Sequence, residues 1–291
     1  MNTKTAAVVP AQVIDAAGAE RPTTVRWRIF LILLLLSAIN YIDRASLSVA
    51  LPLISTEFEM TPALEGLMLS AFFWSYALMQ IPGGMLLDRF QVRNIVGVAT
   101  VGWGFFQAIA GGAQTWMMLL ATRIGLGVAE SPIMPAGAKL NGAWLTPNER
   151  GRGATLVDGG APLGTAFGAI IIAGLITWFD SWRIAFVIAG VGTMIVGVWA
   201  WWYIRNNPAE HPKVNAAELA YITDANAEAA KTHGERKAIL KDLLKSRSVL
   251  AMFAGYACYN CVFYGLLTWM PSYLHKAHNL DIKAMGGATF L

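Results

Sequence analysis

Long apolar stretches divide this sequence and leave it too little charge to cover a surface exposed to water. A helix that crosses the hydrocarbon core needs about 20 mostly apolar residues. Only 14% of the 291 residues are charged, against roughly 25% in soluble domains. The sequence therefore predicts an all-α polytopic protein in a lipid bilayer, with helices near residues 28–54, 63–87, 94–112, 116–139, 152–178, 183–205 and 249–274 and an eighth beginning near Ala284.

The basic residues indicate the orientation of these helices. Lysine and arginine gather in three linkers (DRFQVRN, NERGR and residues 206–248), and the alternate linkers carry almost none. Positively charged loops face the cytoplasm. We therefore expect a multi-pass protein of the cell inner membrane with a cytoplasmic N-terminus. The net charge of +4 reflects this topology and does not indicate a nucleic-acid partner.

The order of the segments is typical of a transporter built from two helical bundles. It predicts a cytoplasmic tail (residues 1–25), a six-helix bundle (26–205), a cytoplasmic linker (206–248) with short amphipathic helices, and the start of a second bundle (249–291). Such transporters bind their substrate near the bilayer midplane, between the bundles. We expect a monomer, and we interpret the incomplete second bundle as a truncated record or a gene fragment.

The sequence offers little for metal or enzyme chemistry. Cys258 and Cys261 lie in an apolar stretch without a second ligand pair, and the histidines all lie between the apolar stretches. A membrane-embedded enzyme would need a nucleophile with its base, or a cluster of metal ligands. Neither H-E-x-x-H nor G-x-S-x-G is present. We expect no metal, no cofactor and no enzymatic activity.

Four ionisable residues lie inside the predicted membrane helices: Asp43 and Arg44 in the first, and Arg123 and Glu130 in the fourth. A charge at the centre of such a helix costs roughly 2.5–3.5 kcal/mol on insertion scales, so it is usually paired and functional. An arginine fork suits a carboxylate, and a buried aspartate or glutamate can carry a proton. The pattern indicates a site for an organic anion; the alternative is two ion pairs that clamp the helices together.

Helical spacing arranges the residues around these charges. Asn40, Asp43 and Arg44 are three or four positions apart and are predicted to share one polar face. Gly160, Gly164 and Gly168 repeat every four residues in the fifth predicted helix. Such a stripe of small residues lets a neighbouring helix approach closely, so we expect it to serve packing.

Several motifs resemble those of a known family. The segment GGMLLDRFQVR resembles the loop signature G-x-L-x-D-R-x-G-x-R of the major facilitator superfamily, with Gln91 in place of a glycine. The segments NYIDR, RIGLGVAESPIMPA, WLTPNERGRG and TWMPSYL are similar to the anion:cation symporters within that superfamily. The resemblance covers nearly the whole chain after residue 25.

The resemblance implies a proton-driven symporter that imports small organic anions by alternating access. It implies that Arg44 and Arg123 hold the substrate carboxylate and that Asp43 and Glu130 couple protons. The other residues to which it extends are the pocket residues Tyr41, Tyr76, Asn260 and Tyr264, and the cytoplasmic gate residues Gly84, Asp88, Arg89 and Arg93. Relatives often carry glutamine where Ala161 stands here, so the substrate stays open between sugar acids and aromatic carboxylates.

Two further alternatives remain. A drug-exporting antiporter of the same superfamily would carry G-P-x-x-G-G in the fifth helix, whereas APLGT lacks its second glycine and has a shorter spacing. The chain could also be a truncated fragment without activity of its own.

Overall fold

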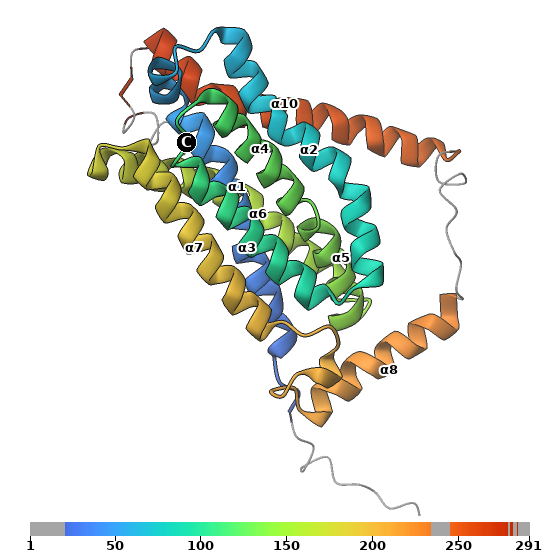
Figure 1. The fold of residues 1–291 in the computed structure, drawn as a ribbon. Coiled ribbons are helices and arrows are strands. Elements are labelled where there is room, and N and C mark those ends of the chain that lie inside the picture. Colours follow the sequence, from blue (N-terminus) through green and yellow to red (C-terminus); the bar gives the residue numbers. More distant parts are fainter. Residues whose placement is uncertain (1–20, 234–244, 279, 282–283, 285–291) are drawn as a thin grey trace, which may run out of the picture.

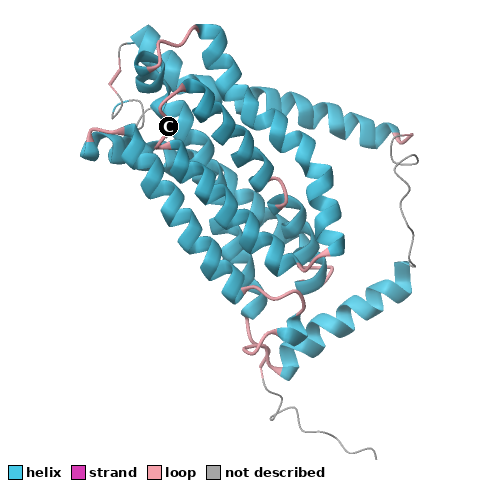
Figure 2. Cartoon of the chain, viewed as in Figure 1, coloured by secondary structure: helices cyan, strands magenta, loops and turns pink. Residues whose placement is uncertain are grey.

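The computed structural model describes residues 21–233, 245–278, 280, 281 and 284, and these residues form helices and connecting loops without any β-strand (Figures 1 and 2). This confirms the predicted all-α fold. The bundle contains α1 (Val25–Glu57), α2 (Pro62–Arg89), α3 (Val92–Ala110), α4 (Trp116–Glu130), α5 (Ile133–Trp144), α6 (Arg150–Phe179) and α7 (Trp182–Tyr203), followed by the short 3-10 turn η1 (Pro208–Glu210), α8 (Ala216–His233) and α10 (Arg247–His278).

The predicted helices agree with the structure to within about one turn, with one exception. The helix expected at 116–139 is divided into α4 and α5 at Ser131 and Pro132. Proline lacks the N–H that the helical ladder needs, and its ring crowds the preceding turn. The helix expected from Ala284 lies almost wholly outside the described residues, as do tail residues 1–20 and linker residues 234–244.

Five helical segments of the described chain are long and apolar enough to cross a membrane: α1, α4 with α5, α6, α7 and α10. Helices α2 and α3 lie in the same bundle (Figure 1). Polar residues such as Glu65 and Gln80 in α2, and Asn94 and Gln107 in α3, lower their hydropathy. These two helices enter the bundle through packing against their neighbours.

The glycine stripe of α6 fixes its contact with α1. A Cβ atom on Gly160 would lie 2.5 Å from the Cβ of Ser37, and one on Gly164 would collide with the main-chain oxygen of Ala38. The two backbones can approach only because these positions lack side chains. The stripe therefore sets the position of α1, which carries Asp43 and Arg44.

Helices α3 and α7 meet through glycines in the same way. A Cβ atom on Gly104 would lie 2.7 Å from the main-chain oxygen of Gly190, and a Cβ on Gly190 would meet the backbone of α3 in return. Trp103 precedes Gly104 in the sequence and Thr193 follows Gly190 by one turn. The close crossing brings both of these side chains against α1.

The linker helix α8 is attached to the end of the bundle where α1 begins. Glu218 of α8 accepts hydrogen bonds from the backbone N–H groups of Val25 and Arg26, at 3.2 Å each. Arg26 forms ion pairs with Glu218 at 2.9 Å and with Glu149, before α6, at 3.1 Å. A carboxylate at the start of a helix satisfies free N–H groups and favours the positive end of its dipole.

Helix α10 crosses the bundle obliquely and is largely exposed along its length (Figure 1). Its contact with the bundle is made by its second half, where Leu267, Thr268, Pro271 and Ser272 are buried. Lys276 near its end forms an ion pair with Glu65 of α2 at 2.9 Å. The two cysteines of α10, Cys258 and Cys261, are free thiols on its exposed part.

Candidate functional site

Arg44 lies in a cage of aromatic rings. The rings of Tyr41, Phe72 and Tyr76 have their centres 4.6, 4.9 and 4.7 Å from the guanidinium carbon, and that of Tyr264 lies at 6.0 Å. The guanidinium also donates a hydrogen bond of 3.0 Å to the hydroxyl of Tyr264. Rings at these distances attract a cation through their quadrupoles. Three of the predicted pocket residues, Tyr41, Tyr76 and Tyr264, thus gather around one of the predicted arginines.

Glu130 of α4 is the ionic partner of Arg44. Its Oε2 accepts hydrogen bonds of 3.4 Å from both Nε and Nη2 of Arg44. Both side chains are almost completely buried, and Oε1 of Glu130 has no hydrogen-bond partner in the described part of the chain. A buried carboxylate with one satisfied oxygen retains an open position for a proton or a further donor.

Asp43 faces a different part of the bundle. Its Oδ2 accepts a hydrogen bond of 3.1 Å from the indole N–H of Trp103, and the hydroxyl of Thr193 lies 3.4 Å from the same oxygen. Its Oδ1 is buried and accepts no hydrogen bond from any residue that the structure describes. The prediction that Asp43 and Arg44 share one face is therefore wrong, because consecutive helical residues lie about 100° apart.

Arg123 is held by a neutral side chain. Its Nη2 donates a hydrogen bond of 2.8 Å to Oε1 of Gln107, whose amide nitrogen donates in turn to Ser46 at 2.8 Å. Nε is buried without a partner. No carboxylate of the described residues forms an ion pair with Arg123, although Asp43 is among its electrostatic neighbours. The four charges thus form one ion pair, between Arg44 and Glu130, where a structural clamp would form two.

The two arginines line one small cavity. Arg44 and Arg123 border it together with Phe72 of α2 and Leu267 and Thr268 of α10, and its volume is about 20 Å³. Such a cavity has room for about one water molecule. A larger ligand can contact both arginines only if some of the helices that line the cavity move apart.

The remaining predicted pocket residue, Asn260, is not part of this cluster. It lies one turn before Tyr264 on α10, and its amide donates 2.9 Å to the main-chain oxygen of Tyr256 within the same helix. Asn40 of α1 is buried, with Oδ1 unpartnered. Of the α10 residues named from the sequence as pocket residues, Tyr264 alone contacts Arg44.

The predicted gate residues lie at the opposite end of α2 from Glu65. Asp88 forms an exposed ion pair of 3.2 Å with Lys139 of α5, rather than with Arg89 or Arg93. Lys139 also donates to the main-chain oxygen of Leu87. Nε of Arg93 instead donates a hydrogen bond of 2.8 Å to the main-chain oxygen of Trp201, and its guanidinium lies over the Trp201 ring.

Gly84, the first predicted gate residue, has open space on its Cβ side. A side chain at this position would therefore meet none of the residues that the structure describes. Arg89 covers the ring of its neighbour Phe90, with 5.9 Å between the guanidinium carbon and the ring centre.

Four residues that complete the site were not predicted from the sequence: Trp103, Gln107, Thr193 and Phe72. Gln107 carried a signal, since it is a polar residue within an apolar stretch and lies one helical turn after Trp103. Thr193 and Phe72 carried none. A threonine and a phenylalanine are ordinary residues of a membrane helix, and only the crossing of helices shows what they contact.

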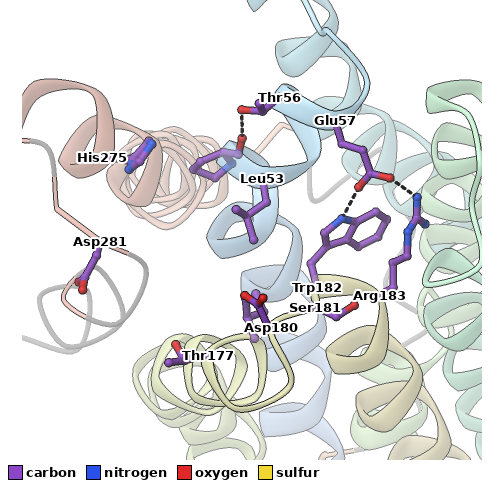
Figure 3. Close-up of a pocket in the computed structure, with 12 residues that line it drawn as sticks. Leu53, Thr56, Glu57, Thr177, Asp180, Ser181, Trp182, Arg183, His275 and Asp281 are labelled. Carbon is purple, nitrogen blue, oxygen red and sulfur yellow. Dashed lines mark hydrogen bonds and ion pairs between the residues drawn. The ribbon is translucent and has the colours of Figure 1, made fainter.

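A larger cavity of about 730 Å³ lies at the C-terminal end of α1 (Figure 3). Glu57 accepts hydrogen bonds there from the indole of Trp182 at 2.8 Å and from Arg183 at 2.5 Å. His275 and Asp281 line its far side. None of the four buried charges borders this cavity, and its main ion pair is partly exposed, so we place the candidate site at the buried cluster.

Comparison with known proteins identifies the family. The sequence model of the Major Facilitator Superfamily matches residues 33–291, which run from within α1 through α10. The chain belongs to the Major Facilitator Superfamily. The predicted resemblance is thereby confirmed, and the chain is that of a multi-pass membrane protein in a superfamily of transporters.

Several of its relatives are named as transporters of sugar acids. The chain is 31% identical over 284 residues to the probable galactarate/D-glucarate transporter GudP of Bacillus subtilis. The alignment covers 92% of this chain and 61% of the relative. The chain is 32% identical over 256 residues to the probable L-galactonate transporter of Escherichia coli. This alignment covers 88% of this chain and 56% of the relative. The chain thus spans about three-fifths of the length of these relatives.

A solved transporter structure has the same fold. The bacterial homologue of the human lysosomal transporter Spinster, in an inward-facing and unoccupied conformation, matches 91% of this chain and 59% of its own chain with a TM-score of 0.68. The sequence identity is 22%, so this likeness concerns the arrangement of the helices alone.

Proposed function

We propose that the protein takes up a small organic anion, a sugar acid, together with protons, by alternating access. The observation that carries this proposal is the state of Arg123. Its guanidinium is buried, has no ionic partner among the residues that the structure describes, and borders the same cavity as Arg44. A buried charge without a counter-charge is costly in a membrane. A substrate carboxylate would supply the missing negative charge and could accept from Nε.

The acidic residues supply the coupling in this proposal. Glu130 is paired with Arg44 through one oxygen only, and Asp43 is held by neutral donors. When a carboxylate substrate binds between the arginines, Glu130 competes with it for Arg44. Protonation of Glu130 would release Arg44 to the substrate, so that the anion and the proton enter the site together.

The proposal extends to the orientation and to the gate. We place the end of the bundle that carries α8 in the cytoplasm of a cell with an inner membrane, with residues 26–205 as the first bundle and 206–248 as the linker. The ion pair between Asp88 and Lys139 lies at that end. Because both side chains are substantially exposed, this pair can break at small cost when the gate opens.

Transport assays test the proposal directly. The full-length gene product is reconstituted in proteoliposomes and supplied with galactarate, D-glucarate, L-galactonate or phthalate. An inward proton gradient should drive accumulation of at least one of the sugar acids, and a protonophore should abolish it. Accumulation that a protonophore leaves unchanged would contradict proton coupling. Export of the anion in exchange for incoming protons would favour the antiporter.

A further inference from the structure

Trp103 and Gln107 lie one turn apart on α3 and bind the two charges of the cluster that do not pair. Trp103 donates from its indole N–H to Oδ2 of Asp43 at 3.1 Å, and Gln107 accepts from Nη2 of Arg123 at 2.8 Å. Trp103, Gln107 and Asp43 are completely buried, and Arg123 is nearly so. One face of α3 therefore holds both an acid and a base that could otherwise neutralise each other.

We propose that these two residues set the pH at which Asp43 takes up its proton, in opposite directions. Trp103 stabilises the charged carboxylate by donating to Oδ2, and Gln107 keeps the Arg123 guanidinium out of ion-pair contact with it. Oδ1, which is buried and unpartnered, is then the atom that accepts the proton. Trp103 and Gln107 are positioning residues in this scheme, and the inference rests on the proton coupling proposed above.

The hydrogen-bonding capacities of the side chains support these roles. An indole N–H can only donate, so it favours the ionised carboxylate over the protonated one. The hydroxyl of Thr193 has a single hydrogen to donate. It donates this hydrogen to the main-chain oxygen of Ala189, at 2.9 Å. Thr193 therefore shares its hydrogen between two acceptors, and Trp103 is the dedicated donor to Asp43 among the described residues.

Few charged side chains of the described residues lie near Asp43. Helix α4 presents Arg123 and Glu130, and Arg44 lies beside Asp43 on α1 with its guanidinium directed to Glu130. Helices α3 and α7 present neutral side chains to it, of which Trp103 and Thr193 are in hydrogen-bond contact. The amide of Gln107 is further fixed by its bond to Ser46, so the position of Arg123 is determined from α1 as well as from α3.

Two substitutions on α3 should therefore have effects of opposite sign. Trp103→Phe keeps an aromatic ring but removes the donor, so Asp43 should protonate at a higher pH. Gln107→Leu keeps the volume but releases Arg123 to pair with Asp43, so Asp43 should protonate at a lower pH. Hydrogen bonds to charged groups are strong enough for each shift to reach about one to two pH units.

Infrared titration of the purified full-length protein measures this without any substrate. The band of the protonated Asp43 carboxyl is identified as the one that Asp43→Asn removes, and its pH midpoint is compared among the variants. Trp144→Phe is the matched control, because Trp144 is also completely buried and donates its indole N–H, at 3.1 Å, to the main-chain oxygen of Arg205. The control should leave the midpoint unchanged.

The outcomes separate this inference from the proposed function. Shifts of the same sign in Trp103→Phe and Gln107→Leu, an equal shift in Trp144→Phe, or no titrating band that depends on Asp43 would overturn the inference. If the band shifts as expected but the pH dependence of sugar-acid accumulation does not follow it, the inference stands. The role of Asp43 in proton coupling then fails.

Discussion

Asp43 and Arg44 are consecutive residues of α1, yet their charged groups bind separate networks. Asp43 accepts from Trp103 of α3, whereas Arg44 pairs with Glu130 of α4 at 3.4 Å. This separation keeps an acid and a base that adjoin in the sequence from neutralising each other. It leaves two carboxylates and two guanidinium groups in one buried region with a single ion pair among them.

The first prediction distinguishes a binding site from a structural clamp. Arg44→Lys or Arg123→Lys keeps the charge and loses the two-pronged donor. If the arginines bind a carboxylate, affinity should fall about tenfold to a hundredfold, since a hydrogen bond to a charged group contributes roughly 1.5–3 kcal/mol. Substrate-dependent thermal stabilisation of the full-length variants measures the affinity. Unchanged affinity together with lower melting temperatures would support the clamp.

A second prediction concerns the proton. Glu130→Gln and Asp43→Asn remove the groups proposed to carry it while keeping similar shapes. Uphill accumulation driven by a proton gradient should be lost, and exchange of labelled for unlabelled substrate should persist, because exchange needs no net proton movement. Both activities are measured in the same proteoliposomes. Full accumulation in both variants would exclude these carboxylates from the coupling.

The packing of α6 on α1 gives a third prediction. Gly164→Ala places a methyl group against the main-chain oxygen of Ala38. This overpacking should destabilise the protein by about 1–3 kcal/mol. Gly174 lies on the same helix with nothing within 4 Å of its Cβ position. Gly174→Ala should be neutral or slightly stabilising, since alanine favours a helix over glycine. Melting temperatures in detergent compare the two, and equal losses would refute the role of the stripe.

A fourth prediction follows from His211, which lies between η1 and α8. Burial, together with the positive charges of Arg205 and Lys213, holds the pKa of His211 below its usual value. The unfolded chain then binds a proton more readily, so stability should fall as the pH drops below about 6.5. Protonation also removes the acceptor at Nδ1 to which the backbone N–H of Lys213 donates at 3.2 Å.

Melting temperatures at neutral pH and at about pH 5.5 test this. The loss on acidification should be smaller in His211→Gln than in the unchanged protein. An equal loss in both would assign the pH dependence to other groups.

The fifth prediction is topological. In a background where Cys258 and Cys261 are replaced by serine, single cysteines are placed at Ala230 of α8 and at Gln114 between α3 and α4, both exposed. A membrane-impermeant maleimide should label Gln114→Cys in intact cells and Ala230→Cys only after permeabilisation. The reverse pattern would overturn the orientation proposed from the basic linkers.

Much of the fold could be predicted because a membrane restricts the choices. Every backbone polar group in the hydrocarbon region must be satisfied locally, so apolar stretches of this length become helices. Their ends followed from the charged linkers and agreed with the structure to within about a turn. The sequence predicted one helix near residues 116–139, and the structure divides it at Ser131 and Pro132. How far a proline opens a helix depends on what the neighbouring helices can satisfy.

The sequence by itself determined that Asp43, Arg44, Arg123 and Glu130 lie buried in the bundle. A charged side chain that faced the lipid would be too costly. Tertiary structure alone decided which of them pair. Helical geometry turns Asp43 and Arg44 about 100° apart, and the close crossing of α3 on α7 at Gly104 and Gly190 brings Trp103 and Thr193 to Asp43. Such contacts depend on how whole helices cross, and no local pattern of residues records that.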